Sequence, residues 1–360
     1  MCTGCAPVSH TPAQADAFAG RLLNTLNEAG IAMMISLGHR TGLFDAMADG
    51  LWYQTAELAH RAGCSPRYVR EWLGAMTVGR IVEHDPMRGM YRLPGAHAAC
   101  LTRHAAPGNL AAAMQWVSTL GAVETLVAEA FMHGRGVAYQ AYERFGPVME
   151  EESLQTVVGG LEQNILPLMP GMTQRLTQGI DVLDVGCGRG RTMVEMAARF
   201  PQSRFTGYDL LADAVEATRS AAVERGLTNL RFEVLDCSTM DHEAAFDLIT
   251  TFDAIHDQAR PEQVLANIRR ALRPGGVYLC QEIKAESDHA GNMDHPVAPF
   301  LYTISTMHCM SVSLAHGGAG LGAMWGRKAC RDLLGRAGFC QVKMHELPHD
   351  IMNDWYVCQP

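Results

Sequence analysis

A glycine-rich loop near the middle of the chain has the composition of a ligand-binding turn. Residues 181–190 read Asp-Val-Leu-Asp-Val-Gly-Cys-Gly-Arg-Gly, an apolar strand-like run that passes into glycines and then into a helical pattern. Gly186, Gly188 and Gly190 let the backbone approach a ligand at the carboxyl end of a parallel sheet. Nucleotide and flavin sites use similar loops, so the glycines alone do not identify the ligand. Asp184 adds a negative charge beside the loop, which suits a cationic ligand better than a diphosphate.

Carboxylates end the next two strand-like runs. Asp209 ends the first, where its oxygens can accept both hydrogen bonds of a ribose diol. Asp236 ends the second, where it can accept a hydrogen bond from the exocyclic amine of an adenine. A ligand that combines adenine, ribose and a positive charge is S-adenosylmethionine (SAM). The predicted cofactor-binding set is Asp184, Gly186, Gly188, Gly190, Asp209, Leu210, Asp236, Cys237 and Phe252.

A histidine and a glutamate follow the last two predicted strands. Methyl transfer from a sulfonium is an in-line displacement, so the protein must align the acceptor and, where necessary, deprotonate it. His256 titrates near neutrality and is the predicted base. Glu282 is its predicted partner, because adjacent strand ends bring the two side chains together and a carboxylate fixes the imidazole tautomer. A helix-capping or surface histidine is the alternative interpretation of His256.

Aromatic and soft side chains are the predicted acceptor-binding residues. Tyr139 and Tyr142 lie on a glycine-flanked segment that is expected to close over the site as a lid, and interdomain packing is the alternative. His308 and Cys309 either line the acceptor pocket or pack within a core helix. Trp325 completes this set.

The cysteines and histidines do not predict a metal site. Cys2 and Cys5 form a CxxC pair, but a zinc site needs two more ligands, and a disordered tail is the simpler interpretation. His308 and Cys309 are chain neighbours, which do not converge on one ion from a helix. Eleven scattered cysteines favour reduced thiols, and residues 1–10 show no secretory signal, so a cytoplasmic location is expected.

The first part of the chain is predicted to be helical. Residues 16–50 have apolar residues at helical spacing, with expected breaks at Gly30, Gly42 and Gly50. A helix over 55–62, a second helix capped by Ser65-Pro66 and a hairpin around the turn at 85–89 follow. Helix, turn, helix and hairpin in this order are typical of a winged-helix domain.

The second part alternates between strand-like and helical runs, the rhythm of a parallel sheet covered by helices. The predicted strands are 181–185, 204–208, 230–234, 246–251 and 276–281, and the predicted helices are 192–200, 212–225 and 261–272. We therefore predict a tail over 1–10, a winged-helix cap and dimerisation domain over 11–105, a helical linker and lid over 106–176, and a SAM-binding catalytic domain over 177–360.

Residues 176–281 resemble class I SAM-dependent methyltransferases. The glycine loop, Asp209, Asp236 and the Leu-Arg-Pro-Gly-Gly run at 272–276 carry this resemblance. It implies an α/β fold with a Rossmann-like catalytic domain, a mostly parallel seven-stranded sheet, behind an N-terminal α-helical winged-helix domain.

Two finer resemblances differ in what they imply. The winged-helix pattern, His256-Asp257 and Glu282 resemble plant-type small-molecule O-methyltransferases, although Gln258 replaces the Trp that commonly follows His-Asp. The segment after Lys284 instead resembles a group of bacterial and animal methyltransferases of largely unassigned substrate.

The interpretation that we favour is a methyltransferase of a small acceptor. The soft residues Met307, Cys309, Met310 and Trp325 slightly favour a small thiol or sulfide, because a thiol is already partly ionised at neutral pH. A small-molecule O-methyltransferase is the alternative within the same class.

A SAM-responsive DNA-binding regulator is the alternative from another class. The predicted recognition helix over 65–79 carries Arg67, Arg70 and Glu71 on a mostly apolar sequence, which favours packing on a protein surface and a homodimer. The chain has 29 basic and 38 acidic residues, a net charge of −9 that disfavours binding to nucleic acid or anionic membranes. The longest apolar stretch, 110–132, is interrupted by polar residues, so no membrane span is predicted.

Overall fold

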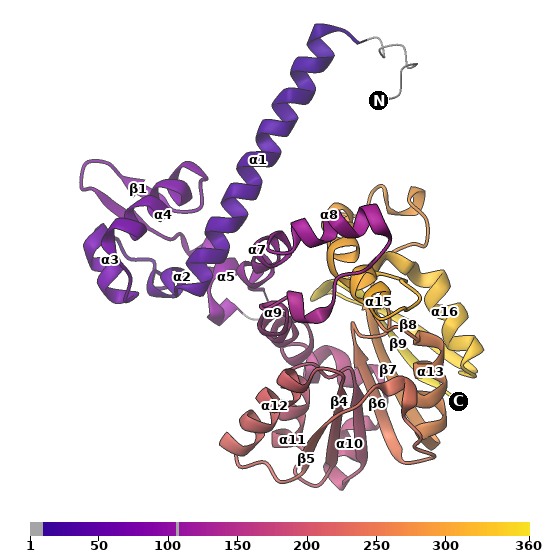
Figure 1. Cartoon of the computed structure of the whole chain (residues 1–360). Coiled ribbons are helices and arrows are strands. Elements are labelled where there is room, and N and C mark those ends of the chain that lie inside the picture. The colour runs from indigo at the N-terminus through magenta and orange to yellow at the C-terminus, as the bar shows by residue number, and fades with distance from the viewer. Residues whose placement is uncertain (1–9, 106–107) are drawn as a thin grey trace. The chain divides into compact units, whose positions relative to one another are not determined.

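The computed structural model of the chain describes residues 10–105 and 108–360 (Figure 1). The described chain divides into two compact units. The first runs to Ala105 and includes Asn109–Ser118, and the second comprises Gly108 and Thr119–Pro360. The predicted Cys2 and Cys5 pair lies outside the described residues.

The first unit contains the predicted winged-helix elements. Two helices, α3 and α4, precede the antiparallel hairpin of β1 and β2, which confirms this part of the fold class. Its elements are α1 (Pro12–Arg40), α2 (Leu43–Ala46), α3 (Thr55–Arg61), α4 (Pro66–Val78), β1 (Glu83–Asp85), β2 (Met90–Arg92), α5 (Gly95–Leu101) and α6 (Leu110–Ala113).

The break expected at Gly30 is absent, because α1 continues through it to Arg40. An isolated glycine costs a helix only about 1 kcal/mol, and α1 begins at a capping box between Thr11 and Gln14. Gly42 does separate α1 from α2, since its φ of 71° is left-handed. Ser65 precedes α4, but its side chain makes no capping hydrogen bond, contrary to the prediction.

The apolar side of α4 packs within the first unit's own core. Val69, Trp72, Leu73 and Met76 are buried there. A Cβ on Gly38 would lie 2.6 Å from the Trp72 ring, so glycine permits the close approach of α1 and α4. The apolar composition of this helix therefore does not indicate a surface for another protein, which corrects the interpretation made from its sequence.

The second unit is built around a sheet. Helix α7 (Gln115–Gly121) spans the division between the units, and the helices that follow are α8 (Glu124–His133), α9 (Phe145–Ser153), α10 (Met172–Gln178), α11 (Arg191–Arg199), α12 (Ala212–Glu224), α13 (Pro261–Ala271), α14 (Ala298–Ile304), α15 (Met310–Ala315) and α16 (Gly326–Arg336). The strands are β3 (Asp181–Val185), β4 (Arg204–Asp209), β5 (Leu230–Val234), β6 (Phe246–Phe252), β7 (Leu272–Ile283), β8 (Gln341–Leu347) and β9 (Asp350–Gln359).

The sheet has seven strands in the order β5-β4-β3-β6-β7-β9-β8. Strand β9 is antiparallel to both of its neighbours, and the strands from β5 to β7 are parallel. The mostly parallel sheet of the predicted fold class is thus confirmed. The strand order reverses at β3, because β4 and β5 lie on one side of it and β6 and β7 on the other. Doubly wound folds bind ligands at such a topological switch point.

Helices cover both faces of this sheet (Figure 1). Neighbouring residues in a strand point to opposite faces, so Val182 packs with α10, α11 and α12, whereas Leu183 packs with α13 and α16. The core therefore lies in two layers, and the carboxyl ends of the parallel strands remain free at one edge.

No single helix among the described residues is long and apolar enough to cross a membrane. One bent pair, Leu110–Gly121 with Glu124–His133, meets the length and composition test only when taken together.

Candidate active site

A cavity of about 520 Å³ lies at the carboxyl edge of the sheet. Its walls come from the glycine loop after β3 and from the ends of β4, β5 and β6, and α9 adds further residues. Every residue of the predicted cofactor-binding set lines this one cavity, namely Asp184, Gly186, Gly188, Gly190, Asp209, Leu210, Asp236, Cys237 and Phe252.

The three loop glycines all have positive φ, but a side chain would meet different surroundings at each position. A Cβ on Gly186 would lie 2.7 Å from the Ala254 side chain, and one on Gly190 would lie 2.3 Å from Thr218. A Cβ on Gly188 would meet nothing within 4 Å. Gly188 therefore borders open space in the cavity, where a ligand can approach the backbone closely.

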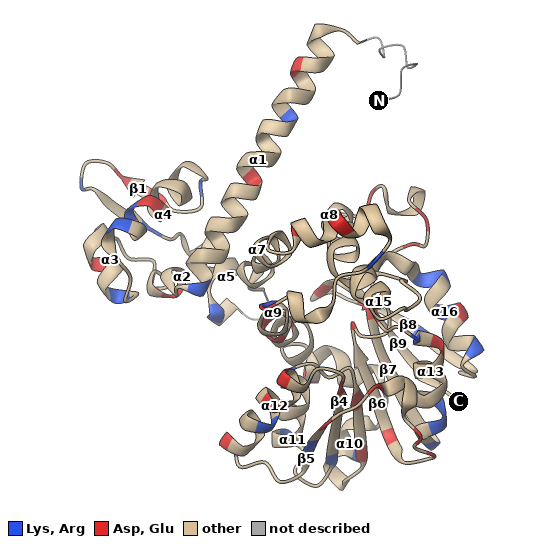
Figure 2. Ribbon diagram, viewed as in Figure 1, with Lys and Arg blue, Asp and Glu red and all other residues tan. Residues whose placement is uncertain are grey.

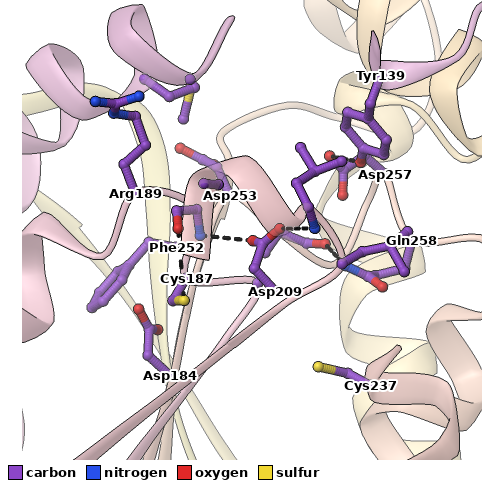
Figure 3. Close-up of a pocket in the computed structure, with 18 of the residues that line it drawn as sticks. Tyr139, Asp184, Cys187, Arg189, Asp209, Cys237, Phe252, Asp253, Asp257 and Gln258 are labelled. Carbon is purple, nitrogen blue, oxygen red and sulfur yellow. Dashed lines mark hydrogen bonds between the residues drawn. The ribbon is translucent and has the colours of Figure 1, made fainter. Parts of the chain in front are cut away.

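Asp209 ties the end of β4 to the glycine loop (Figure 3). Its Oδ2 accepts a hydrogen bond from the Gly188 N–H at 2.7 Å, and its Oδ1 accepts one from the Leu211 N–H at 2.9 Å. A carboxylate offers about four lone-pair sites, so acceptor capacity remains for a ligand. Burial raises the pKa of Asp209 above its ordinary value.

The two other predicted acids have separate local roles. Asp184 is 2% exposed and accepts a hydrogen bond from the Thr250 hydroxyl at 2.7 Å. Burial, with a contribution from the charge of Asp209, raises the pKa of Asp184 to about 7. Asp236 accepts the Ser238 N–H at 2.9 Å and thereby begins a short 3-10 turn, η6 (Cys237–Thr239).

His256 and Glu282 form a buried pair behind this cavity. The distance from His256 Nδ1 to Glu282 Oε2 is 2.6 Å, and the two side chains are 3% and 1% exposed. Glu282 also accepts the Ile255 N–H at 2.9 Å and the Trp325 indole N–H at 3.2 Å. Burial opposes a charge on His256, but the charge of Glu282 and interactions with Cys309 hold its pKa well above the ordinary value.

His308 and Cys309 lie next to this pair in a π-helical turn, η8 (Ser305–Cys309). The Cys309 thiol lies close enough to His256 to affect its pKa. The His308 ring stacks on Phe145 with centroids 3.7 Å apart and meets the Tyr142 ring edge-on at 4.8 Å. Neither His308 nitrogen has a hydrogen-bond partner among the described residues, and burial lowers the pKa of His308 to about 3, so His308 is neutral.

Tyr139 and Tyr142 attach the glycine-flanked segment to the rest of the site. The Tyr139 hydroxyl donates to Asp257 Oδ2 at 2.8 Å, and Figure 3 shows the two side chains pointing toward each other. The Tyr142 hydroxyl donates to the Met307 carbonyl. Of the predicted acceptor-binding residues, Tyr139 lines the cavity. Tyr142, His308, Cys309 and Trp325 lie outside its lining and are buried behind it, as are His256 and Glu282.

Other cavity-lining residues were not predicted. Phe145 and Met149 come from α9, whose sequence carries no motif. Asp257 is next to His256 in the chain, so the sequence could have indicated that it lies at the site. Asp253 follows β6 with a left-handed φ of 50°, a feature that its sequence does not reveal.

Asp253, His256 and Glu282 also place three donor atoms within 4.8 Å of one another, the spacing that a cation needs. The Glu282 oxygens already accept three N–H groups. A carboxylate that is committed in this way is suited to orienting an imidazole rather than to binding a metal.

Two family models match the chain. Residues 29–103 match the Rv2258c-like winged HTH domain, and residues 176–305 match a family described as methyltransferase domain. Residues 176–305 thus form a domain of the methyltransferase type. Its sheet, its glycine loop and the two acids that follow all lie within or beside the second match.

Curated relatives align with parts of the chain. It is 36% identical over 111 residues to trans-aconitate 2-methyltransferase of Deinococcus radiodurans, an alignment that covers 31% of this chain and 40% of that protein. It is 30% identical over 111 residues to fatty-acid O-methyltransferase of Mycolicibacterium smegmatis, with the same coverage of 31% and 40%. The chain thus spans less than half the length of these two relatives.

Solved structures resemble the chain over almost its whole length. Human N-acetylserotonin methyltransferase in complex with SAM has a TM-score of 0.68 at 18% identity and covers 98% of this chain and 99% of its own. An O-methyltransferase-like protein from Nostoc punctiforme has a TM-score of 0.67 at 18% identity, covering 98% and 100%. At this identity the likeness is one of fold.

These comparisons confirm the predicted combination of a winged-helix domain and a methyltransferase domain. At the level of the second domain they also confirm the predicted enzyme class and its cofactor, SAM. The preference for a thiol acceptor finds no support, because similar structures include O-methyltransferases such as mitomycin 7-O-methyltransferase. A DNA-binding regulator is not favoured either.

Proposed function

We propose that this protein transfers the methyl group of SAM to a hydroxyl group of a small molecule. The observation that carries the proposal is the buried pair of His256 and Glu282, 2.6 Å apart, directly behind the cavity of the methyltransferase domain. A hydroxyl is a poor nucleophile until its proton is removed, and this pair supplies a base.

The cavity fits the proposed cofactor. Its volume, about 520 Å³, lies within the range of roughly 300–1,000 Å³ that is usual for small-molecule sites. Gly188 leaves room for close approach to the backbone. Asp209 and Asp236 would hold the ribose and the adenine, and Asp184 would face the positively charged part. SAM supplies an electrophilic methyl carbon when it is bound.

The proposed chemistry assigns separate tasks to the pair. His256 would take the proton of the acceptor hydroxyl at Nε2, and the oxygen would receive the methyl group that SAM would supply, with S-adenosylhomocysteine as the leaving product. Glu282 accepts from Nδ1, which fixes the tautomer and stabilises the imidazolium that forms. Because the pKa of His256 is raised, its affinity for a proton is closer to that of a hydroxyl than an ordinary histidine's.

A thiol is the second candidate acceptor. Cys309 gives the surroundings of His256 a soft character, and a thiol needs little help from a base. A raised base pKa has less value for such an acceptor, so we favour the hydroxyl.

The acceptor reaches His256 through movement of the segment that carries Tyr139, Tyr142 and Phe145. In the described structure these three rings pack against His308, whose chain neighbour Cys309 lies close to His256. Two hydrogen bonds, from Tyr139 to Asp257 and from Tyr142 to Met307, close the segment. We propose that this segment is a lid that opens for the acceptor.

The test is a panel of phenols, aliphatic alcohols, thiols and amines, with release of S-adenosylhomocysteine as the readout. The proposal expects release with at least one hydroxyl acceptor and a methyl ether as its product. Release with thiols alone would favour the second candidate, and no SAM binding would refute both.

We propose further that the chain forms a homodimer through α1. Phe18, Leu22, Leu23 and Leu26 are 54% to 70% exposed, and three of them share one face at a spacing of four residues. Few charges interrupt this helix (Figure 2). A second copy of α1 offers the same apolar face, so two copies would cover each other.

A further inference from the structure

Asp253 occupies an unusual position between the cavity and the His256–Glu282 pair. It follows β6 directly and lines the cavity. Its backbone is held by a hydrogen bond from its N–H to the Gln281 carbonyl at 3.1 Å, with a left-handed φ of 50°. A residue other than glycine is rarely found in this conformation, and such residues concentrate at functional sites.

The Asp253 carboxyl lacks a partner within the described residues. Its Oδ1 is shut off from solvent and accepts no hydrogen bond. Buried polar atoms in native proteins are nearly always paired, so an orphaned carboxyl oxygen beside a cavity indicates a group that a ligand supplies. Figure 3 shows Asp253 among the residues that line the cavity.

The charges around Asp253 indicate which charge the ligand group carries. Glu282, Asp350 and Glu152 all add negative potential, and His256 alone opposes them, so burial and these acids raise the pKa of Asp253 well above its ordinary value. An anionic ligand group would be repelled here. A cationic donor would both satisfy the orphaned oxygen and balance the negative charge.

Two of the three arginines that line the cavity are paired with other acids, and the third, Arg260, is exposed to solvent. Arg189 lines the cavity but binds Glu150 at 2.7 Å, and Arg191 pairs with Glu195 at 3.3 Å. Three other acids line the cavity, and their negative charge also favours a positively charged ligand: Asp184, Asp209 and Asp257.

We propose that Asp253 is a further binding residue that takes an ammonium group of a ligand bound in this cavity. The inference rests on the proposed function, and two sources supply such a group. One is the methionyl ammonium of SAM, and the other is an amine carried by the acceptor. In either case Asp253 makes the site selective for ligands with that amine.

The test uses Asp253→Asn. Asparagine is nearly the same size and tolerates the left-handed backbone, so the variant removes the charge without adding strain. Asp241→Asn is the matched control, because Asp241 is exposed and does not line the cavity. Thermal unfolding of both variants shows that each is folded. Asp253→Gly, which relieves the backbone strain, serves as a second variant in case Asp253→Asn does not fold.

Calorimetry then separates the two sources. If the methionyl ammonium binds Asp253, Asp253→Asn weakens S-adenosylhomocysteine tenfold or more, whereas 5′-methylthioadenosine, which lacks that ammonium, binds as before. If the acceptor's amine binds, S-adenosylhomocysteine affinity is unchanged and KM rises tenfold or more for amine-bearing acceptors but not for amine-free ones.

The inference is overturned if Asp253→Asn matches the wild type toward S-adenosylhomocysteine and toward every acceptor that the wild type methylates. It is also overturned if the affinities for S-adenosylhomocysteine and 5′-methylthioadenosine fall equally. Failure of the proposed function looks different, since the wild type itself would then bind no S-adenosylhomocysteine.

Discussion

His256 Nδ1 lies 2.6 Å from Glu282 Oε2, where Glu282 belongs to β7 and His256 follows the end of the neighbouring parallel strand β6 by four residues. The register pairs Phe252 at the end of β6 with Gln281 near the end of β7, so the chain positions just beyond them are neighbours. Because Nδ1 is engaged by Glu282, Nε2 is the nitrogen that remains to take a proton. The sheet itself thus orients the proposed base.

Replacing Glu282 by Gln should lower turnover by at least about tenfold and move the pH profile. His256 must be deprotonated to act as a base, so kcat/KM rises with pH through its pKa, which Glu282 raises. Without this carboxylate the imidazolium loses its counter-charge, and the rising limb should shift to lower pH. Trp325→Phe, which removes one hydrogen bond to Glu282, should shift it less. A pH–rate series on the three proteins is the measurement, and an unmoved limb in Glu282→Gln would contradict the assigned pairing.

Replacing Asp209 by Asn should weaken SAM binding by about tenfold or more. The substitution removes the charge from hydrogen bonds that are each worth on the order of 1.5–3 kcal/mol, and it loosens the contact with Gly188. Calorimetry with SAM measures the effect. The exposed Asp241→Asn serves as control, and equal affinities in both variants would show that Asp209 does not hold the cofactor.

SAM affinity should increase as the pH rises from about 5.5 to 8. In the empty cavity the pKa of Asp184 is about 7 and that of Asp257 about 6, because both carboxyl groups are buried. A cationic ligand binds the ionised forms better, so at lower pH these protons must be released on binding. Calorimetry in two buffers of different ionisation enthalpy detects this release. A flat affinity, with no proton released, would mean that the acids do not face the cation.

The paired substitution Leu22→Glu and Leu26→Glu should convert the proposed dimer into a monomer. Both side chains are exposed on α1, and charges there would be buried in the interface at a cost of several kcal/mol. Light scattering at micromolar concentration measures the mass. Val78→Glu, at an exposed apolar position on α4, should leave the dimer intact. A monomeric wild type would refute the proposal directly.

Local patterns predicted the strands well. Asp181–Val185 and Leu230–Val234 have the same bounds in the sequence prediction and in the structure. An apolar run between turn signals locates the buried strand β3, and alternating apolar and polar residues locate the edge strand β5. The strands β8 and β9 were not located from the residues. Their sequences mix polar and apolar residues. These strands form by pairing, β8 with β9 and β9 with β7, and the local sequence does not reveal this pairing.

The candidate site was predictable where strand ends define it. Asp184, Asp209 and Asp236 lie at or near the carboxyl ends of strands, so parallel topology brings them together at one cavity. Asp253 was missed because its left-handed backbone and its unpaired oxygen exist only in the folded chain. The sequence also could not show whether His308 and Cys309 are buried, because burial there depends on the packing of Phe145 against His308.

The most direct test of the proposed reaction compares the wild type with His256→Ala on hydroxyl and thiol acceptors between pH 6 and 9. General-base catalysis contributes about 10²–10⁴-fold, so loss of His256 should lower methylation of a hydroxyl by about 10² or more at pH 7 while SAM affinity is retained. The loss should shrink as the pH approaches the acceptor's own pKa. A variant that methylates hydroxyl acceptors as fast as the wild type over this whole range would contradict the account, because His256 would then be structural.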